Sequence, residues 1–384
     1  MTTFKGYRRA DGRVGVRNVV AILSAMDNTN PSAERIASMV TGTTVVSTPF
    51  GRGQIGADFE VTLRTLAGIA GHPNVASVLV LSLSLASGRD LAERLRKVGK
   101  SVEVLGLQEM GSAMALTMEG VRLAARMVIE ASAQQREDCQ VEELIVGVEC
   151  GGSDTTSGLA SNPAVGRFSD RLVDAGGTII LSEPAEFMGA EHLLAARAVD
   201  PEDGQKIFDM VRWFEEEAMR NGVDMRGTNP TPDNIEGGLS TLEEKSLGAI
   251  AKGGTRPIVE VIDYSEPPEK RGLIVMNTPS AACESMTGLA AGSAQIIIFS
   301  TGRGNAIGAP IAPTVKVTGN PHTATSMAEN IDVDVSGILT EGVALEDAGE
   351  QVWRCVMQVA GGMLTCCEAL QEQQLSVSRF GPSV

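Results

Sequence analysis

The sequence predicts an α/β protein with two mostly parallel, Rossmann-like sheets, one within residues 1–140 and the other within residues 141–384. Short apolar runs alternate with amphipathic helical patterns in the first third of the chain, and the alternation resumes after residue 144. Strands separated by helices form βαβ units with parallel strands. A charged segment between the two series is interpreted as a linker, and 384 residues are enough for two domains.

Each expected strand is a short run of branched apolar residues, and each expected helix places apolar residues three or four positions apart. In the first domain we expect strands at 18–25, 44–48, 75–85 and 102–107, and helices at 31–40, 58–69, 88–98 and 110–135. In the second domain we expect strands at 144–148, 178–181, 273–276, 295–299 and 314–318, and helices at 163–175, 184–198, 202–221, 242–251 and 345–370. Segment 225–238 is rich in Asn, Pro, Thr and Gly, which predicts a loop.

Composition excludes several classes of protein. The net charge of −16 disfavours nucleic acids and anionic membranes, because both are bound through clustered Lys and Arg. No apolar run reaches the ~18 residues that span a bilayer, and the charged N-terminus is unlike a secretory signal. We therefore expect a cytoplasmic protein. Its six cysteines show no CxxC spacing, which predicts free thiols.

A glycine-rich segment follows the expected strand 144–148 and leads into an expected helix. Its sequence offers backbone N–H groups and hydroxyls at the carboxyl end of a strand, where α/β sheets bind ligands. Asn162 is the expected N-cap of that helix, with Pro163 as its first residue. A tight turn whose hydroxyls cap the helix is the structural alternative. The candidate substrate-binding residues are Cys150, Gly151, Gly152, Ser153, Asp154, Ser157 and Asn162.

Carboxylates and a histidine follow the expected strand 178–181. Glu183 and Glu186 are three residues apart and could share a face at a helix start, where the helix dipole alone could explain a carboxylate. The functional alternative makes Glu183 and Glu186 ligands of a divalent metal, or makes Glu186 or His192 a catalytic base. A lone histidine such as His192 is more often structural.

Cationic side chains occur in two further segments. Lys245 and Lys252 are seven residues apart, or two helical turns, so one helix face could present both to an anion. An ordinary solvated lysine pair is the alternative. Thr301 and Arg303 follow the expected strand 295–299, and the glycines on either side of Arg303 leave room for a planar oxyanion.

Taken together, these segments resemble the altronate/galactarate dehydratase family in its large, C-terminal catalytic portion. The matching segments keep the family's order along nearly the whole chain: FKGYRRADGRVGVRN, HPNV, ECGGSDTTSGLASNPAVG, GGTIILSEPAEFMGAEHLLAARA, GGLSTLEEKSLGAIAKGG and FSTGRGNAIGAP. The family includes sugar-acid dehydratases and a related lyase that eliminates sulfite from 3-sulfolactate. The resemblance implies a separate small subunit, and we also expect a homo-oligomer.

The resemblance also points to a difference from the sugar-acid members, which carry cysteines in three N-terminal motifs. No Cys stands near Asp27, Arg52 or Ala86 in the corresponding stretches, and Arg52 and Arg89 add positive charge there. Because thiolates suit iron, we expect no iron–sulfur cluster and, where a metal binds, a labile divalent ion such as Mg²⁺, Mn²⁺ or Fe²⁺. The added charge gives weight to the sulfonate branch.

The sequence therefore predicts a lyase that abstracts the proton α to a carboxylate and expels a β substituent from a small hydroxy acid. The leading expectation is loss of water from a sugar acid, and the alternative is loss of sulfite from (2R)-3-sulfolactate. A non-catalytic paralogue that binds a sugar acid or a partner subunit is the alternative from another class. Glu186, His192 and Lys245 are the candidate catalytic residues. Lys252, Thr301 and Arg303 join the glycine-rich segment in binding the substrate, because a developing dianion needs cations around it.

Overall fold

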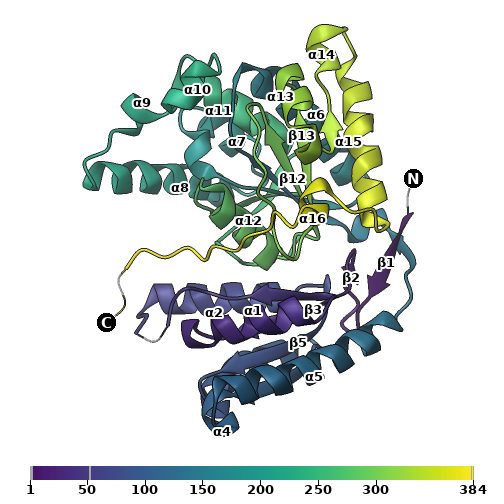
Figure 1. The fold of residues 1–384 in the computed structure, drawn as a ribbon. Helices are drawn as coiled ribbons and strands as arrows, with labels where there is room; N and C mark the ends of the chain where they lie inside the picture. Colours follow the sequence, from purple (N-terminus) through teal and green to yellow (C-terminus); the bar gives the residue numbers. More distant parts are fainter. Residues whose placement is uncertain (1–2, 52, 382, 384) are drawn as a thin grey trace.

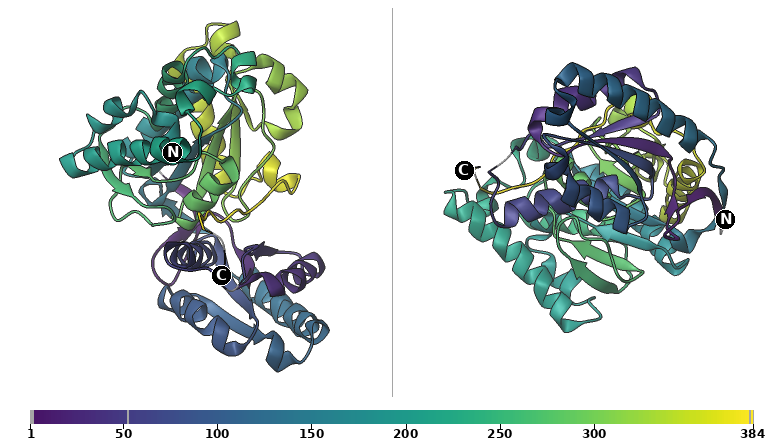
Figure 2. Two further views of the ribbon diagram at one scale, coloured as in Figure 1. Left: turned by 90° about the vertical axis from the view of Figure 1, so that its left-hand side faces the viewer. Right: turned by 90° about the horizontal axis from the view of Figure 1, so that it is seen from below.

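The computed structural model describes residues 3–51, 53–381 and 383, so Arg52 lies outside the described residues. Two α/β units are stacked on one another, the N-terminal unit below the larger C-terminal unit (Figure 1). Each contains a parallel sheet with helices on both faces, as seen also in the two turned views (Figure 2). The expected α/β class with parallel sheets is confirmed.

The N-terminal sheet has four parallel strands in the order β4-β3-β5-β6. Its strands are β3 (Val19–Ser24), β4 (Thr43–Val46), β5 (Val75–Ser82) and β6 (Ser101–Gly106). Helices α2 (Ala57–Ala70) and α3 (Leu85–Lys97) pack on one face, while α1 (Asn30–Met39) and α5 (Ala113–Ser132) pack on the other. The short α4 (Leu107–Met110) joins β6 to α5. Because both faces are covered, the two central strands β3 and β5 are mostly apolar.

The C-terminal sheet has seven parallel strands in the order β10-β11-β9-β8-β12-β13-β14. Their bounds are β8 (Ile145–Cys150), β9 (Thr178–Leu181), β10 (Ile258–Ile262), β11 (Leu273–Met276), β12 (Ile296–Thr301), β13 (Thr314–Thr318) and β14 (Val333–Asp334). The first strand of this sheet along the chain is β8. The next strands, β9, β10 and β11, lie on one side of β8, and the chain then returns to form β12 on the other side. The strand order therefore reverses between β8 and β12, and such a switch point opens a crevice at the carboxyl ends of the strands.

Helices cover both faces of this larger sheet. Four of them pack against one face: α6 (Asn162–Asp174), α8 (Pro201–Arg220), α11 (Leu242–Ile250) and α15 (Leu345–Ala360). Helix α12 (Ala282–Ala291) packs against the other face. The remaining helices are short: α7 (Glu191–Ala195), α9 (Met225–Thr228), α10 (Pro232–Glu236), α13 (Pro321–Ser326), α14 (Gly337–Thr340) and α16 (Cys366–Ala369). Among the described residues, no helix is long and apolar enough to cross a membrane.

Several expected elements are wrong in their extent. The segment 134–143 contains β7 (Glu137–Gln140), which pairs with β1 (Thr3–Arg8) in a small antiparallel sheet that also holds β2 (Val14–Gly15). The helix expected at 184–198 is a 3₁₀ turn, Pro184–Phe187, followed by α7. The loop expected at 225–238 contains α9 and α10. The last helix ends at Ala360, because Gly362 adopts a φ of 116° that other residues rarely take.

The two α/β units are joined by buried contacts. The Cα of Gly68 in α2 faces the end of α12, and a Cβ at this position would lie 2.4 Å from the carbonyl oxygen of Ala291. The buried ring of His72 has its Nε2 3.1 Å from the carbonyl oxygen of Ala294. The buried amide of Asn74 donates to the carbonyl oxygen of Gln295 at 2.9 Å. Close backbone packing with satisfied polar groups holds the units together.

Candidate active site

The predicted site residues gather at the carboxyl edge of the seven-stranded sheet, on both sides of the switch point between β8 and β12. The chain leaves β8 at Cys150 and enters the glycine-rich loop, and it leaves β12 at Thr301. Glu183 follows β9, the other neighbour of β8. In Figure 1 this edge lies in the upper part of the molecule, away from the N-terminal unit. It is therefore the expected place for a ligand.

The loop after β8 is held against the loop after β12 by backbone hydrogen bonds. The Gly151 N–H donates to the carbonyl oxygen of Ser300 at 3.1 Å, and the Arg303 N–H donates to the carbonyl oxygen of Gly152 at 2.8 Å. Gly152 has a φ of +64°, and a Cβ there would lie 3.2 Å from the carbonyl oxygen of Gly304. The N–H groups of Gly152 and Ser153 donate no hydrogen bond to other described residues. They are free to bind an anion.

Asp154 caps the helical segment that begins after this loop. Its Oδ1 accepts hydrogen bonds from the Thr156 hydroxyl at 2.6 Å and from the Ser157 N–H at 3.0 Å, while its Oδ2 accepts from the Asn320 amide at 2.8 Å. Gly302 makes room for this carboxylate, because a Cβ there would lie 2.1 Å from Oδ1. Both carboxylate oxygens of Asp154 accept hydrogen bonds from the protein itself. Asp154 therefore caps the helical segment and shapes the loop, as the structural alternative for this segment predicted.

The expected N-cap at Asn162 is wrong. Asn162 has a helical φ of −64°, because a π-helical turn, Ser157–Ser161, already runs into α6. The Asn162 side chain is buried, and its amide donates to the carbonyl oxygen of Gly248 at 2.9 Å. Asn162 therefore holds α6 against α11, and its Oδ1 has no hydrogen-bond partner among the described residues.

A fully buried ion pair lies directly behind the glycine-rich loop. Lys252 Nζ is 3.0 Å from Glu183 Oε2, and their side chains are 0% and 1% exposed. The same Oε2 accepts the N–H of Cys150 at 2.9 Å, while Lys252 Nζ donates to the Cys150 Sγ at 3.3 Å. Burial raises the pKa of the Cys150 thiol, which therefore stays neutral. Burial alone would lower the pKa of Lys252, but the acidic groups around it raise that pKa above its usual value.

Sequence reasoning missed Glu149, the residue before Cys150. Its side chain is fully buried, and its Oε2 accepts hydrogen bonds from the hydroxyls of Ser182, at 2.9 Å, and Ser285. Burial and the charge of Glu183 raise the pKa of Glu149 well above its ordinary value. A glutamate within the apolar run IVGVEC was the available signal, because a strand covered on both faces rarely carries a charge.

A second ion pair lies nearer the surface. Lys245 Nζ is 3.0 Å from Glu186 Oε2, with side chains 8% and 14% exposed. The Lys245 ammonium also donates to Asn229 Oδ1 at 2.7 Å, and Asn229 comes from the segment that was expected to be an unstructured loop. Burial raises the pKa of Glu186, against the opposing effect of Lys245. Lys245 lies on α11, whereas Lys252 lies in the 3₁₀ turn Ala251–Gly253 that follows it. Both lysines are buried, and each is paired with a carboxylate rather than solvated.

The remaining predicted residues lie apart from these ion pairs. The Thr301 side chain is buried, and its Oγ1 accepts the N–H of Gly304 at 3.0 Å. The Arg303 guanidinium is at the surface, where it donates to Glu236 Oε2 and to the carbonyl oxygen of Asp233, both at 2.9 Å. His192 is exposed on α7. Roles for Arg303 and His192 in catalysis stay predictions.

The carboxylates at this edge do not fit a divalent cation. The sequence suggested Glu183 and Glu186 as metal ligands, but each faces a lysine ammonium at 3.0 Å. Among the described residues, no group of three or more His, Cys, Asp or Glu side chains is arranged to hold a metal ion. A metal bound here would have to displace ammonium groups from the carboxylates. The cations at this edge are therefore the lysine ammonium groups of the protein itself.

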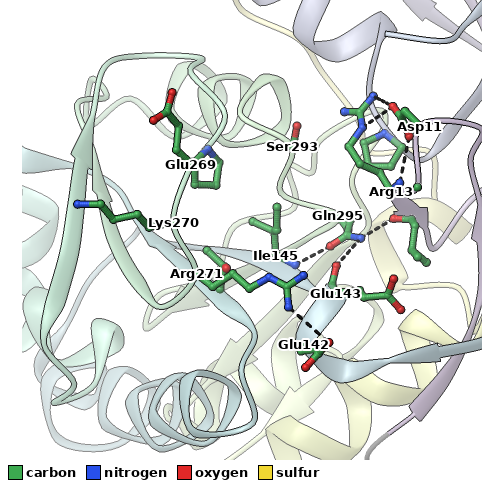
Figure 3. A pocket seen from close by; sticks show the side chains of 15 residues that line it. Asp11, Arg13, Glu142, Glu143, Ile145, Glu269, Lys270, Arg271, Ser293 and Gln295 are labelled. Carbon is green, nitrogen blue, oxygen red and sulfur yellow. Dashed lines mark hydrogen bonds and ion pairs between the residues drawn. The ribbon is translucent and has the colours of Figure 1, made fainter.

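A polar cavity of about 410 Å³ lies at the opposite edge of the same sheet (Figure 3). Its lining includes Ile145, the first residue of β8, and Thr178, the first residue of β9. Arg13 and Arg271 point into this region but are paired, Arg13 with Asp11 and Arg271 with Glu142 (Figure 3). None of the predicted site residues lines this cavity. It lies between the two α/β units, away from the catalytic candidates.

Comparison with known proteins identifies the family. Residues 141–383 match the family described as D-galactarate/altronate dehydratase, C-terminal, and residues 6–132 match D-galactarate dehydratase/altronate hydrolase, second domain. The chain belongs to the D-galactarate/altronate dehydratase family. The resemblance predicted from the sequence motifs is thereby confirmed, and so is the expectation of a lyase.

The similar members of this family differ in how much of their length the chain covers. The (2R)-sulfolactate sulfo-lyase subunit beta of Chromohalobacter salexigens is 40% identical, over 98% of this chain and 97% of that protein. An altronate dehydratase of Bacillus subtilis is 34% identical, over 99% of this chain and 78% of that protein. The galactarate dehydratase (L-threo-forming) of Escherichia coli is 31% identical, over 94% of this chain and 73% of that protein. All three are named as lyases of small acids.

Proposed function

We propose that this chain is the larger subunit of a lyase that cleaves (2R)-3-sulfolactate into pyruvate and sulfite. The observation that carries this choice is the 40% identity to a sulfo-lyase subunit beta over nearly the full length of both chains. The dehydratase relatives are 31–34% identical and extend well beyond the matched region. The name of the sulfo-lyase relative also supports a separate partner subunit. Free thiols throughout the chain support a reducing, cytoplasmic location.

The reaction requires a base and cations. The base removes the proton from C2 of sulfolactate, the C3–S bond breaks, and sulfite leaves with the bonding electron pair. The resulting enol of pyruvate takes a proton at C3 and becomes pyruvate. Because the C2 proton is weakly acidic, the dianion that forms at the carboxylate must be stabilised by donors already in place.

The residues at the carboxyl edge supply these groups. Glu186 is the preferred base over the exposed His192, because burial raises the pKa of Glu186 and a stronger base abstracts a carbon-bound proton more readily. Lys245, which is bonded to Glu186, neutralises the substrate carboxylate. The free N–H groups of Gly152 and Ser153 bind its oxygens. Arg303, at the rim, binds the second anionic group of the substrate.

Product assays test this proposal. The chain is combined with its small subunit and incubated with 3-sulfolactate or with a panel of aldonic and aldaric acids. Formation of sulfite and pyruvate in equal amounts supports the proposal. Formation of 2-keto-3-deoxy acids identifies the second candidate function, sugar-acid dehydration, which the family membership favours. Thermal stabilisation by a ligand without turnover of any substrate would favour a binding protein instead.

Variants test the assigned residues. Lys245→Met removes the ammonium beside Glu186 and is expected to lower kcat/KM by about a hundredfold or more, as loss of a charge-assisted contact to a developing anion does. Glu186→Gln is expected to abolish turnover. In the parent, kcat/KM rises with pH as Glu186 ionises, and because burial raises the pKa of Glu186, this rise lies above the pH range in which an exposed glutamate ionises. Lys270→Met, at the surface on the opposite edge, is the matched control. An active Lys245→Met variant would contradict the assignment.

A further inference from the structure

Two buried carboxyl groups, those of Glu149 and Glu183, meet behind the glycine-rich loop, and the sequence motifs gave a candidate role only to Glu183. Glu149 is 0% exposed and Glu183 is 1% exposed. Contacts of adjacent residues hold the two side chains close together: the N–H of Cys150, next to Glu149, donates to Glu183 Oε2 at 2.9 Å, and the hydroxyl of Ser182, next to Glu183, donates to Glu149 Oε2 at 2.9 Å. The hydroxyls of Ser182 and Ser285 donate to Oε2 of Glu149, whereas its buried Oε1 has no donor among the described residues.

The charges around this pair do not balance when both carboxyl groups are ionised. Lys252 is the ammonium bonded to the pair, and it contacts Glu183. A second carboxylate at Glu149 would be a buried charge without a counter-ion, and two facing acceptors cannot bond to each other. A proton on Oε1 of Glu149 removes the extra charge and turns the orphaned acceptor into a donor.

The other titratable groups that face Glu149 do not change this balance. The Cys150 thiol on the same strand is neutral, because burial raises its pKa. Lys316 on β13 donates to the carbonyl oxygen of Ile307, and its Nζ lies 3.4 Å from the centre of the Phe299 ring. Burial lowers the pKa of Lys316 to about 8, so its charge is not a secure counter-ion for Glu149.

We propose that Glu149 is a neutral carboxylic acid whose Oε1–H donates a hydrogen bond to Glu183, so that Glu149 is a positioning residue for the Glu183–Lys252 ion pair. The proton keeps this part of the site at zero net charge. Loss of the proton places an uncompensated negative charge behind the loop that receives the substrate, and an anionic substrate is then repelled. This kinetic consequence rests on the proposed function, whereas the hydrogen bond itself does not.

Infrared spectroscopy tests the protonation of Glu149 without any substrate. A buried carboxylic acid has a C=O stretching band that a carboxylate lacks, and Glu149→Gln removes that band while keeping the shape and an N–H donor. We expect the band at neutral pH in the parent and in the control variant Glu269→Gln, whose side chain is exposed at the opposite edge (Figure 3). We expect it to be missing from Glu149→Gln. Identical spectra in all three proteins overturn the proposal.

The pH profile tests the consequence for the reaction. In the parent and in Glu269→Gln, kcat/KM is expected to fall at alkaline pH through a rise in KM, as Glu149 loses its proton. In Glu149→Gln this fall is expected to be absent, since the amide cannot ionise. Glu149→Leu, which offers no donor to Glu183, is expected to have a kcat/KM at least about tenfold below that of Glu149→Gln at every pH.

Each remaining outcome is decisive. An alkaline fall in Glu149→Gln that matches the parent overturns the proposal. So does a Glu149→Gln protein that does not fold while Glu269→Gln folds, because the amide reproduces the neutral acid and fails only where the carboxylate charge is needed. If the parent turns over no 3-sulfolactate, the proposed function fails, and the infrared band still decides whether Glu149 carries a proton.

Discussion

Replacing Lys252 by Met removes the cation that is bonded to the buried carboxylate of Glu183. Lys252 Nζ lies 3.0 Å from Glu183 Oε2 and also donates to the Cys150 Sγ at 3.3 Å. Methionine fills much of the same space but leaves the charge of Glu183 unpaired in a site where neither side chain reaches solvent. Breaking such a pair by removing one partner costs about 3–5 kcal/mol. The exposed control Lys270→Met is expected to cost less than about 1 kcal/mol.

Tryptophan fluorescence during urea unfolding measures this loss in the relevant part of the chain. The only two tryptophans, Trp213 and Trp353, both lie on helices of the C-terminal unit. The signal therefore reports unfolding of the seven-stranded sheet and its helices, and the change in midpoint gives the change in free energy when the slope is constant. The double variant Lys252→Met/Glu183→Gln carries no unpaired charge. It is expected to be at least about 2 kcal/mol more stable than the sum of the two single effects predicts.

Two results would refute this reasoning. A fall of less than about 1 kcal/mol in Lys252→Met would mean that water reaches Glu183 and screens its charge, as at exposed pairs. Strictly additive effects of the two substitutions would mean that Lys252 and Glu183 do not interact in the folded protein. Either result would also remove the basis for treating Glu149 as a neutral acid.

Three further outcomes are expected. Arg303→Lys lowers kcat/KM about tenfold or more, because the planar guanidinium is lost. The thermal midpoint changes little, because the ion pair between Arg303 and Glu236 is exposed. Unchanged kcat/KM would remove Arg303 from the site. Gly302→Ala forces a Cβ against the capping carboxylate of Asp154 and costs about 1–3 kcal/mol in urea unfolding, and a smaller effect would show that the loop is free to shift. Thiol reagents label the partly exposed Cys283 and Cys366 first, and all six cysteines after denaturation without reductant, whereas a count below six would reveal a disulfide.

Much of the fold could be predicted because parallel strands buried on both faces are short apolar runs that stand out from their surroundings. Three elements lacked this signal. Helix α12 is buried on nearly all sides, with seven consecutive buried residues from Ser285 to Ala291, so its sequence shows no polar face. Strands β1 and β7 form a small exposed sheet and carry charges, so β7 resembled a linker.

The site was predictable only in part. The glycine-rich loop and the carboxyl ends of β8, β9 and β12 could be located, because glycines and polar residues directly after apolar runs mark that edge of a parallel sheet. The direction in which each side chain points could not be predicted. Arg303 is adjacent in sequence to Gly302 in that loop, yet its guanidinium turns outward to Glu236 on α10.

The sequence by itself determined the α/β class, the family and the segments that make up the candidate site, because these depend on local patterns of residues. Only the tertiary structure decided which charges meet. Glu183 and Lys252 come from the end of β9 and the turn after α11, and Glu149 from β8, so no local spacing links them. The state of each group depends on burial and on neighbours brought together by strand order. At the surface, Lys252 would be a solvated cation. Here it is a buried counter-ion, because the sheet and its helices exclude water from it.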